Sequence, residues 1–217
     1  MPRPEVPLES TYPYLLTGRL WPHRVFPRHR RSNHTRWQSR LNDYDDVLML
    51  APDLLAIHLG IVDAAPRIFT ERQKWLVGKL PALLRRPLLR VVSSQRHRLT
   101  RWFPKVYVPI PEFLASLRRT FAAALQANPK CAFVVVGIPP TTARNESRSY
   151  GYDANIRRYN DALQSLAGEF RAEFIDLYAL FRPDEDLLED GMHLSARGQG
   201  RLADLLARAI RERLGAA

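Results

Sequence analysis

The run Cys131-Ala-Phe-Val-Val-Val-Gly-Ile138, closed by Pro139-Pro140, is the clearest strand signal in this chain. It is apolar throughout, which is typical of a parallel strand buried on both faces. Asp53-Leu-Leu-Ala-Ile-His-Leu-Gly60 has the same character and ends at a glycine, and Glu173-Phe-Ile-Asp-Leu177 is a weaker third candidate. Together they predict parallel strands at residues 53–59, 131–137 and 173–177.

Segments with helical periodicity lie between these strands. Residues 112–126 and 153–170 each place their large apolar side chains on one face, and a last amphipathic helix begins near Ser195. Shorter elements are expected before them, a helix at residues 12–20 and a strand at residues 21–26. Strands that alternate with such helices favour βαβ units, in which helices cover both faces of a parallel sheet. The C-terminal ends of the strands, and with them the functional site, are then expected along one edge.

The composition limits the class of protein. With 217 residues, 46% hydrophobic and 25% charged, the chain is typical of a globular protein and long enough for a substantial core. A single cysteine, Cys131, excludes an internal disulfide. The sequence has no apolar run of membrane-spanning length and no signal peptide, so a cytoplasmic location is expected by default. Neither zinc-type His/Cys spacing nor a glycine-rich phosphate loop occurs, so we expect no metal and no cofactor.

The net charge of +11 is unevenly distributed. Residues 1–40 carry eight Arg against two Glu, and residues 64–110 carry eleven Lys or Arg against Glu71 alone. The second stretch has enough leucine and tryptophan for one or two helices, and we interpret it as a helical insertion and a candidate lid over the strand edge. Because only four of the 33 bases are lysine, the arginine content can reflect coding bias, and a solvated basic face is preferred over nucleic-acid binding.

Asp190-Gly-Met-His193 lies between the last strand and the last helix, and it is the only D-x-x-H in the sequence. At this spacing in a turn, the carboxylate can accept a hydrogen bond from one imidazole nitrogen and fix the tautomer. The other nitrogen then serves as a general base toward a hydroxyl nucleophile. The alternative is a carboxylate that caps a loop beside an exposed histidine.

Together with Gly60-Ile-Val-Asp63 after the second strand candidate, this block resembles the SGNH/GDSL hydrolase family, in a bacterial branch with G-I-V-D in the third block. The resemblance covers most of residues 1–217 and implies a single domain with the three-layer α/β/α, flavodoxin-like fold. It also implies hydrolysis of an ester or acyl group, on a small molecule or a saccharide, by a Ser-His-Asp arrangement that includes His193 and Asp190. Gly60 and, in a looser alignment, Asn33 are the positions expected near the oxyanion.

Two departures from the family's pattern stand out. No G-D-S occurs, and residues 1–7 resemble the segment that normally follows that block, so the first, central strand and the nucleophile are expected to be missing. Val62 replaces the family's asparagine and has no side-chain donor. Among the ten serines, Ser32 comes nearest to a candidate for the nucleophile. Either the start is assigned too far downstream or the chain is a pseudoenzyme, and in both cases we expect it to be nearly inactive on simple esters.

Three functions therefore remain open. The first is the hydrolase, which the oriented Asp190–His193 pair favours because a pure binding module needs no base. The second is an inactive family member that binds an acylated or saccharide ligand. The third is an anion-binding protein that uses its basic stretches on nucleic acid or a membrane surface, which a steep loss of binding with salt would reveal.

Overall fold

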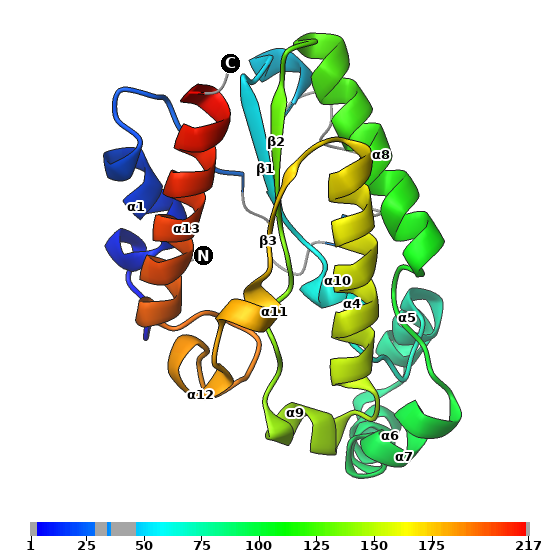
Figure 1. Cartoon of the computed structure of the whole chain (residues 1–217). Helices are drawn as coiled ribbons and strands as arrows, with labels where there is room; N and C mark the ends of the chain where they lie inside the picture. Colours follow the sequence, from blue (N-terminus) through cyan, green and yellow to red (C-terminus); the bar gives the residue numbers. More distant parts are fainter. Residues whose placement is uncertain (1–3, 29–33, 36–46, 216–217) are drawn as a thin grey trace.

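A computed structural model describes residues 4–28, 34–35 and 47–215 (Figure 1). In chain order, the 3-10 helices (η), α-helices and strands are η1 (Leu8–Ser10), α1 (Tyr12–Arg19), η2 (Leu48–Leu50), β1 (Leu54–His58), α4 (Ile61–Ala64), α5 (Glu71–Lys79), α6 (Ala82–Ser94), α7 (Arg96–Trp102), α8 (Ile110–Ala127), β2 (Ala132–Val136), α9 (Ala143–Arg148), α10 (Tyr152–Glu169), β3 (Glu173–Ile175), α11 (Leu177–Leu180), α12 (Pro183–Asp186) and α13 (Ala196–Gly215).

The three strands form a parallel sheet in the order β1-β2-β3, which confirms the three predicted strands and their direction. β3 is shorter than predicted. Its last residue is Ile175, because Asp176 caps α11 instead, with a side-chain oxygen that accepts a hydrogen bond from the Ala179 amide at 3.1 Å. Within the described residues, β1 pairs with a neighbour on one side only.

Helices cover both faces of this sheet, as the alternation of elements predicts (Figure 1). Successive side chains of a strand point to opposite faces. Phe133 and Val135 of β2 accordingly pack into a core with α8 and α10, whereas Val134 and Val136 pack into a second core with α1 and α13. All four side chains are nearly inaccessible to solvent, which explains why the run 131–138 is apolar at every position.

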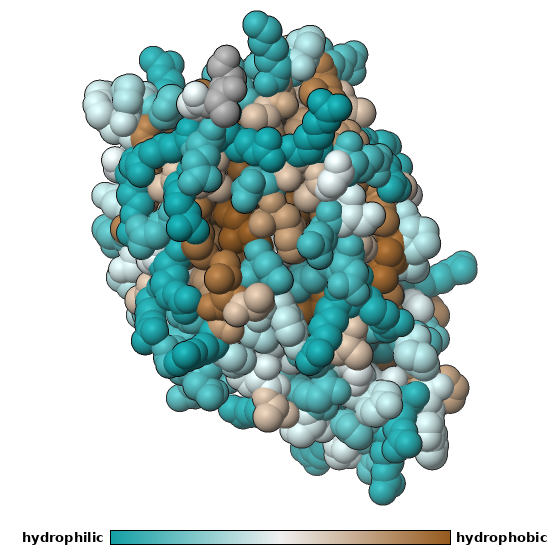
Figure 2. Space-filling view, in the orientation of Figure 1, coloured by the Kyte–Doolittle hydropathy of each residue, from teal (hydrophilic) through white to brown (hydrophobic). Residues whose placement is uncertain are grey.

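The sheet's other edge is β3, which faces the viewer in Figure 1. Figure 2 shows the same face in the same orientation, where hydrophilic side chains surround an apolar centre over β3 and the helices beside it. In the described part of the chain, none of the helices is both long enough and apolar enough to cross a bilayer.

The predicted insertion at residues 64–110 is helical, and its helices α5, α6 and α7 lie near the C-terminal ends of the strands (Figure 1). α5 begins with a capping box, in which Thr70 and Gln73 exchange side-chain to backbone hydrogen bonds. α6 packs chiefly on α7 and has no buried residue.

One predicted element is absent, and two candidate residues lie outside the described part of the chain. The strand expected at residues 21–26 is absent: the chain turns at 21–23 and is irregular over 24–28. Pro22 lacks an amide to donate, and no strand of the described sheet pairs with this segment. Ser32 and Asn33 lie outside the described residues.

Candidate active site

Asp190 and His193 form a closed turn just before α13. The Asp190 Oδ2 atom lies 2.6 Å from Nδ1 of His193, and Oδ1 accepts hydrogen bonds from the amides of Met192 and His193, each at 3.0 Å. The predicted contact between the two side chains is therefore confirmed. Burial opposes ionisation of Asp190, but the two amides and the imidazole outweigh it and hold the pKa of the carboxyl below its usual value.

The turn is fixed against α9 by the residues that follow β2. Asn145 donates from its side-chain amide to the Asp190 carbonyl at 2.8 Å, and the Thr141 hydroxyl donates to the Gly191 carbonyl at 3.3 Å. Gly191 has φ of +64°, and a Cβ at this position would collide with Thr142 and Asn145. A glycine is therefore required here for both conformation and space.

On its other side, the turn is anchored to the start of α13. The Leu188 amide donates to the His193 carbonyl at 2.7 Å. Ser195 donates to the carbonyl of Glu185 at 2.9 Å and accepts from the Gly198 amide at 3.1 Å. Because these bonds hold both ends, the His193 ring is presented at a defined place next to the cavity.

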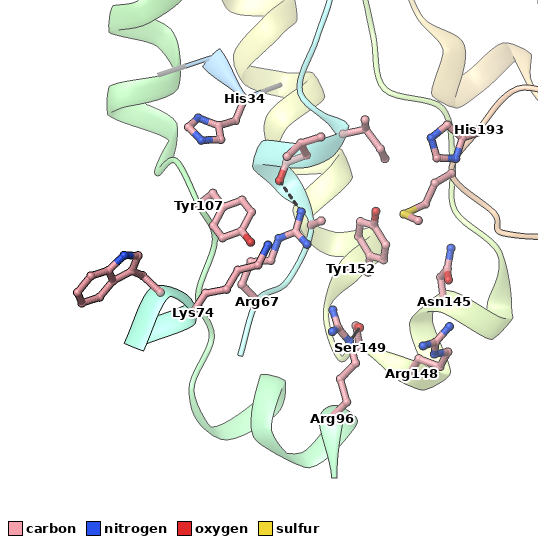
Figure 3. A pocket seen from close by; sticks show the side chains of 15 residues that line it. His34, Arg67, Lys74, Arg96, Tyr107, Asn145, Arg148, Ser149, Tyr152 and His193 are labelled. Carbon is pink, nitrogen blue, oxygen red and sulfur yellow. Dashed lines mark hydrogen bonds between the residues drawn. The ribbon is translucent and has the colours of Figure 1, made fainter. Parts of the chain in front are cut away.

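A cavity of about 730 Å³ opens beside His193 (Figure 3). It is lined by residues of the His193 turn, α4, α5, α7, α9 and α10, by residues of the segments that follow α4, α7 and α9, and by His34. The lining residues are His34, Ile61, Val62, Ala65, Arg67, Lys74, Trp75, Arg96, Tyr107, Asn145, Arg148, Ser149, Tyr152, Met192 and His193. None of these described residues is an aspartate or glutamate.

Two arginines of the cavity are held by neutral groups. Arg67 donates to the Val62 carbonyl at 3.3 Å and lies with its guanidinium 4.2 Å from the centre of the Tyr107 ring. Arg96 donates from Nε to the Ser149 hydroxyl at 2.6 Å and from its terminal nitrogen to the Pro66 carbonyl at 2.9 Å. These contacts fix the position of each guanidinium without neutralising its charge.

The Gly60-Ile-Val-Asp63 segment lies at the C-terminal end of β1. Gly60 has φ of +122°, and a Cβ there would meet Ile138 at 2.8 Å, so the glycine is required by packing as well as by conformation. Asp63 is fully buried and accepts hydrogen bonds from the amide and hydroxyl of Thr35, at 3.0 and 2.9 Å. Burial raises the pKa of the Asp63 carboxyl against these two bonds.

The predicted site residues differ in how they stand to the cavity. Asp190 contacts His193, and His193 lines the cavity. Gly60 is next to the lining residue Ile61 but is not itself part of the lining, so its role at the oxyanion stays a prediction, as does that of Asn33. The described residues contain no group of three His, Cys, Asp or Glu side chains that could hold a metal ion.

Sequence reasoning missed the rest of the cavity. Arg67, Arg96, Arg148 and Tyr152 lie on separate segments, and no short motif connects them. The excess of basic residues at 64–110 was the one signal available, and it does not distinguish a cavity wall from a solvated surface.

A profile of the GDSL-like lipase/acylhydrolase family matches residues 6–201. An acetylxylan esterase from Xylanibacter ruminicola is 25% identical over 173 residues, which cover 77% of this chain. The chain matches only 30% of the length of that relative.

Solved structures show the same fold at lower identity. The acetylxylan esterase Axe2 from Geobacillus stearothermophilus is 20% identical, with a TM-score of 0.58 over 94% of this chain and 81% of that chain. A lipase/acylhydrolase from Enterococcus faecalis is 18% identical, with a TM-score of 0.55 over 84% of this chain and 72% of that one. Solved variants of Axe2 include three catalytic mutants, in which alanine replaces a serine, an aspartate and the histidine three residues after that aspartate.

Proposed function

The chain belongs to the GDSL-like lipase/acylhydrolase family, and on this premise we propose that its site hydrolyses an ester bond of an O-acyl group, with an acylated saccharide as the substrate. The saccharide is supported by two similar proteins, both described as acetylxylan esterases. His193 and Asp190 are the proposed catalytic pair.

The Asp190–His193 contact is the observation that carries this proposal. An ionised Asp190 at 2.6 Å accepts a hydrogen bond from Nδ1–H, so the imidazole is held in the tautomer with Nε2 as the proton acceptor. The three-residue spacing is also the one between the aspartate and the histidine replaced in the catalytic mutants of Axe2.

The chemistry follows from that tautomer. Nε2 of His193 takes the proton of the nucleophile's hydroxyl while the hydroxyl oxygen bonds to the acyl carbon. The carbonyl oxygen of the ester then becomes an oxyanion. The imidazolium, stabilised by Asp190, then gives its proton to the leaving alcohol as the ester bond breaks. A water molecule, activated by the same nitrogen, releases the acid. Gly60 and Asn33 are the proposed groups at the oxyanion, where Val62 lacks a donor side chain.

We further propose that these 217 residues lack the serine nucleophile. No G-D-S occurs in the sequence. Ser149 shares the cavity with His193, but its hydroxyl accepts a short hydrogen bond from Arg96 and so is oriented by a cation rather than by the base. Loss of one triad member typically lowers turnover by about 10⁴ or more, so the chain is expected to be nearly inactive on simple esters.

The test is hydrolysis of 4-nitrophenyl acetate by this chain and by a version extended upstream along its reading frame, each also made as His193→Ala. We expect activity in the extended protein and its loss on His193→Ala. Full activity in the 217-residue chain would show that the nucleophile is already present. A folded but inactive extended protein would contradict the hydrolase and favour a member that only binds its ligand.

A further inference from the structure

Four cations from four separate segments line the cavity beside His193. Arg67 follows α4, Lys74 lies on α5, Arg96 begins α7 and Arg148 ends α9. Figure 3 shows the Tyr152 ring between Arg67 and the side of the cavity that holds His193. A cavity with four positive charges and, among its described lining residues, no acid is suited to a negatively charged ligand.

Among the residues that the structure describes, no acidic group balances these charges. Within the described residues, none of the four pairs with an aspartate or glutamate. The groups that accept from Arg67 and Arg96 are two carbonyls and a hydroxyl. Burial, and after it repulsion from Arg67 and Arg148, lowers the pKa of the Arg96 guanidinium, which indicates that the three guanidinium groups act on one another.

Two buried donors in the same cavity also lack an acceptor. Nε of Arg67 and the hydroxyl of Tyr152 are buried and have no hydrogen-bond partner among the described residues. Tyr152 is 4% exposed, and burial raises the pKa of its hydroxyl to about 12, so it is present as a donor. Buried polar groups are nearly always satisfied by protein, water or ligand, and an anion supplies acceptors to both donors at once.

A basic patch that is only solvated does not account for these observations. On a solvated face, arginine heads extend into water, whereas Arg96 is half-buried and fixed through two hydrogen bonds close to other cations. Such an arrangement costs free energy unless a counter-charge binds there. At about 730 Å³, the cavity has the size of a small-molecule site.

We propose that the natural ester substrate carries a fixed anionic group, a carboxylate or a phosphate, which binds to Arg67, Lys74, Arg96 and Arg148 while the ester lies at His193. The ester part of this inference rests on the proposed function, whereas the anion part rests only on the charges and donors of the cavity. It narrows the substrate from acylated saccharides in general to those with an acidic group.

The test compares acetyl esters of one shape that differ in charge. Binding of 4-acetoxybenzoate, 4-acetoxyphenyl phosphate and neutral methyl 4-acetoxybenzoate is measured by calorimetry on the 217-residue chain, and again on His193→Ala to separate binding from hydrolysis. We expect at least one anion to bind about tenfold or more tightly than the neutral ester. The tighter of the two anions identifies the preferred group.

Variants of the cavity residues test whether the preference for an anion arises in this cavity. Lys74 and Arg148 are exposed, so the double variant K74Q/R148Q should fold normally and lose most of the preference for the anion. Tyr152→Phe should weaken anion binding and leave the neutral ester unaffected. Arg208→Gln, an exposed arginine on α13, makes the same charge change on the other face of the sheet and should alter nothing.

Equal affinity for all three esters, or an anion preference that survives K74Q/R148Q and Tyr152→Phe, would overturn the anion site. A different result, the absence of ester hydrolysis in the extended protein, would contradict the proposed function. The two outcomes can therefore be told apart.

Discussion

The two sides of the cavity are built in different ways. The base side is made within four consecutive residues, Asp190 to His193, whose hydrogen bonds close one turn. The cationic side collects Arg67, Lys74, Arg96 and Arg148 from segments up to 81 residues apart. A catalytic pair whose residues lie in one turn can be recognised in a sequence. The cationic side of the cavity cannot, because its residues come together only when the chain folds.

The two sides should also fail differently when they are changed. Substitutions in the turn should affect the chemical step for every substrate. Substitutions in the cationic side should affect only ligands that carry a charge.

The largest effect is expected from the base side. In any form of the protein that hydrolyses esters, His193→Gln should lower kcat by about 10⁶, because it removes the base. Asp190→Asn should lower kcat by about 10⁴, because the imidazole loses the carboxylate that fixes its tautomer. Steady-state kinetics on neutral and anionic acetyl esters check this. A loss confined to the anionic ester would contradict the division between the two sides.

The second prediction concerns the backbone of the Asp190–His193 turn and the stability that its conformation requires. Gly191→Ala should cost about 1–2 kcal/mol of unfolding free energy from the left-handed φ alone, with a further cost from contact with Thr142 and Asn145. Urea unfolding measures it. The control is Gly168→Ala in α10, where nothing lies within 4 Å of the added Cβ and where alanine should stabilise the helix by about 0.5–1 kcal/mol. Equal effects at the two glycines would show that the turn is not the constrained element described above.

How much of this could be foreseen depends on distance along the chain. The strands were predictable because a run such as 131–138 is apolar on both faces, and the Asp190–His193 contact was predictable because both residues lie in one turn. The early end of β3 was missed, since Asp176 continues the strand pattern in sequence yet caps α11.

The cationic side could not be foreseen for a physical reason. Arg96 reaches Ser149 across 53 positions, and Tyr152 is buried by packing that no local pattern encodes. The excess of base at residues 64–110 is visible in the sequence, but only the fold decides which of these side chains turn inward.

A smaller effect is expected when a cation is removed from the wall. Arg96→Met deletes two hydrogen bonds worth about 1 kcal/mol each, but it also relieves repulsion from Arg67 and Arg148. The two effects oppose each other, so the net loss of unfolding free energy should be below about 2 kcal/mol. Urea unfolding of Arg96→Met against Arg98→Met, an exposed neighbour on α7, measures it. A larger loss would show that Arg96 is chiefly a structural anchor.

The smallest effect concerns pH. Because the pKa of Asp190 is lowered in the folded protein, its contribution to stability is present in full above its unfolded value of about 3.9 and is lost as the pH falls through the lower folded value. The difference in urea midpoint between the native chain and Asp190→Asn should shrink as the pH falls below about 4. A difference that grows over this acidic range would contradict the hydrogen-bonded carboxylate.

The most direct test of the account asks where the proton of His193 resides. Nitrogen and proton NMR of the imidazole, at a pH where the ring is neutral, distinguishes protonated Nδ1 from protonated Nε2 without any need for activity. The 2.6 Å contact predicts a protonated Nδ1 with a slowly exchanging, downfield proton signal that Asp190→Asn abolishes. A proton on Nε2, or a signal unchanged in Asp190→Asn, would contradict the claim that Asp190 prepares His193 as a base.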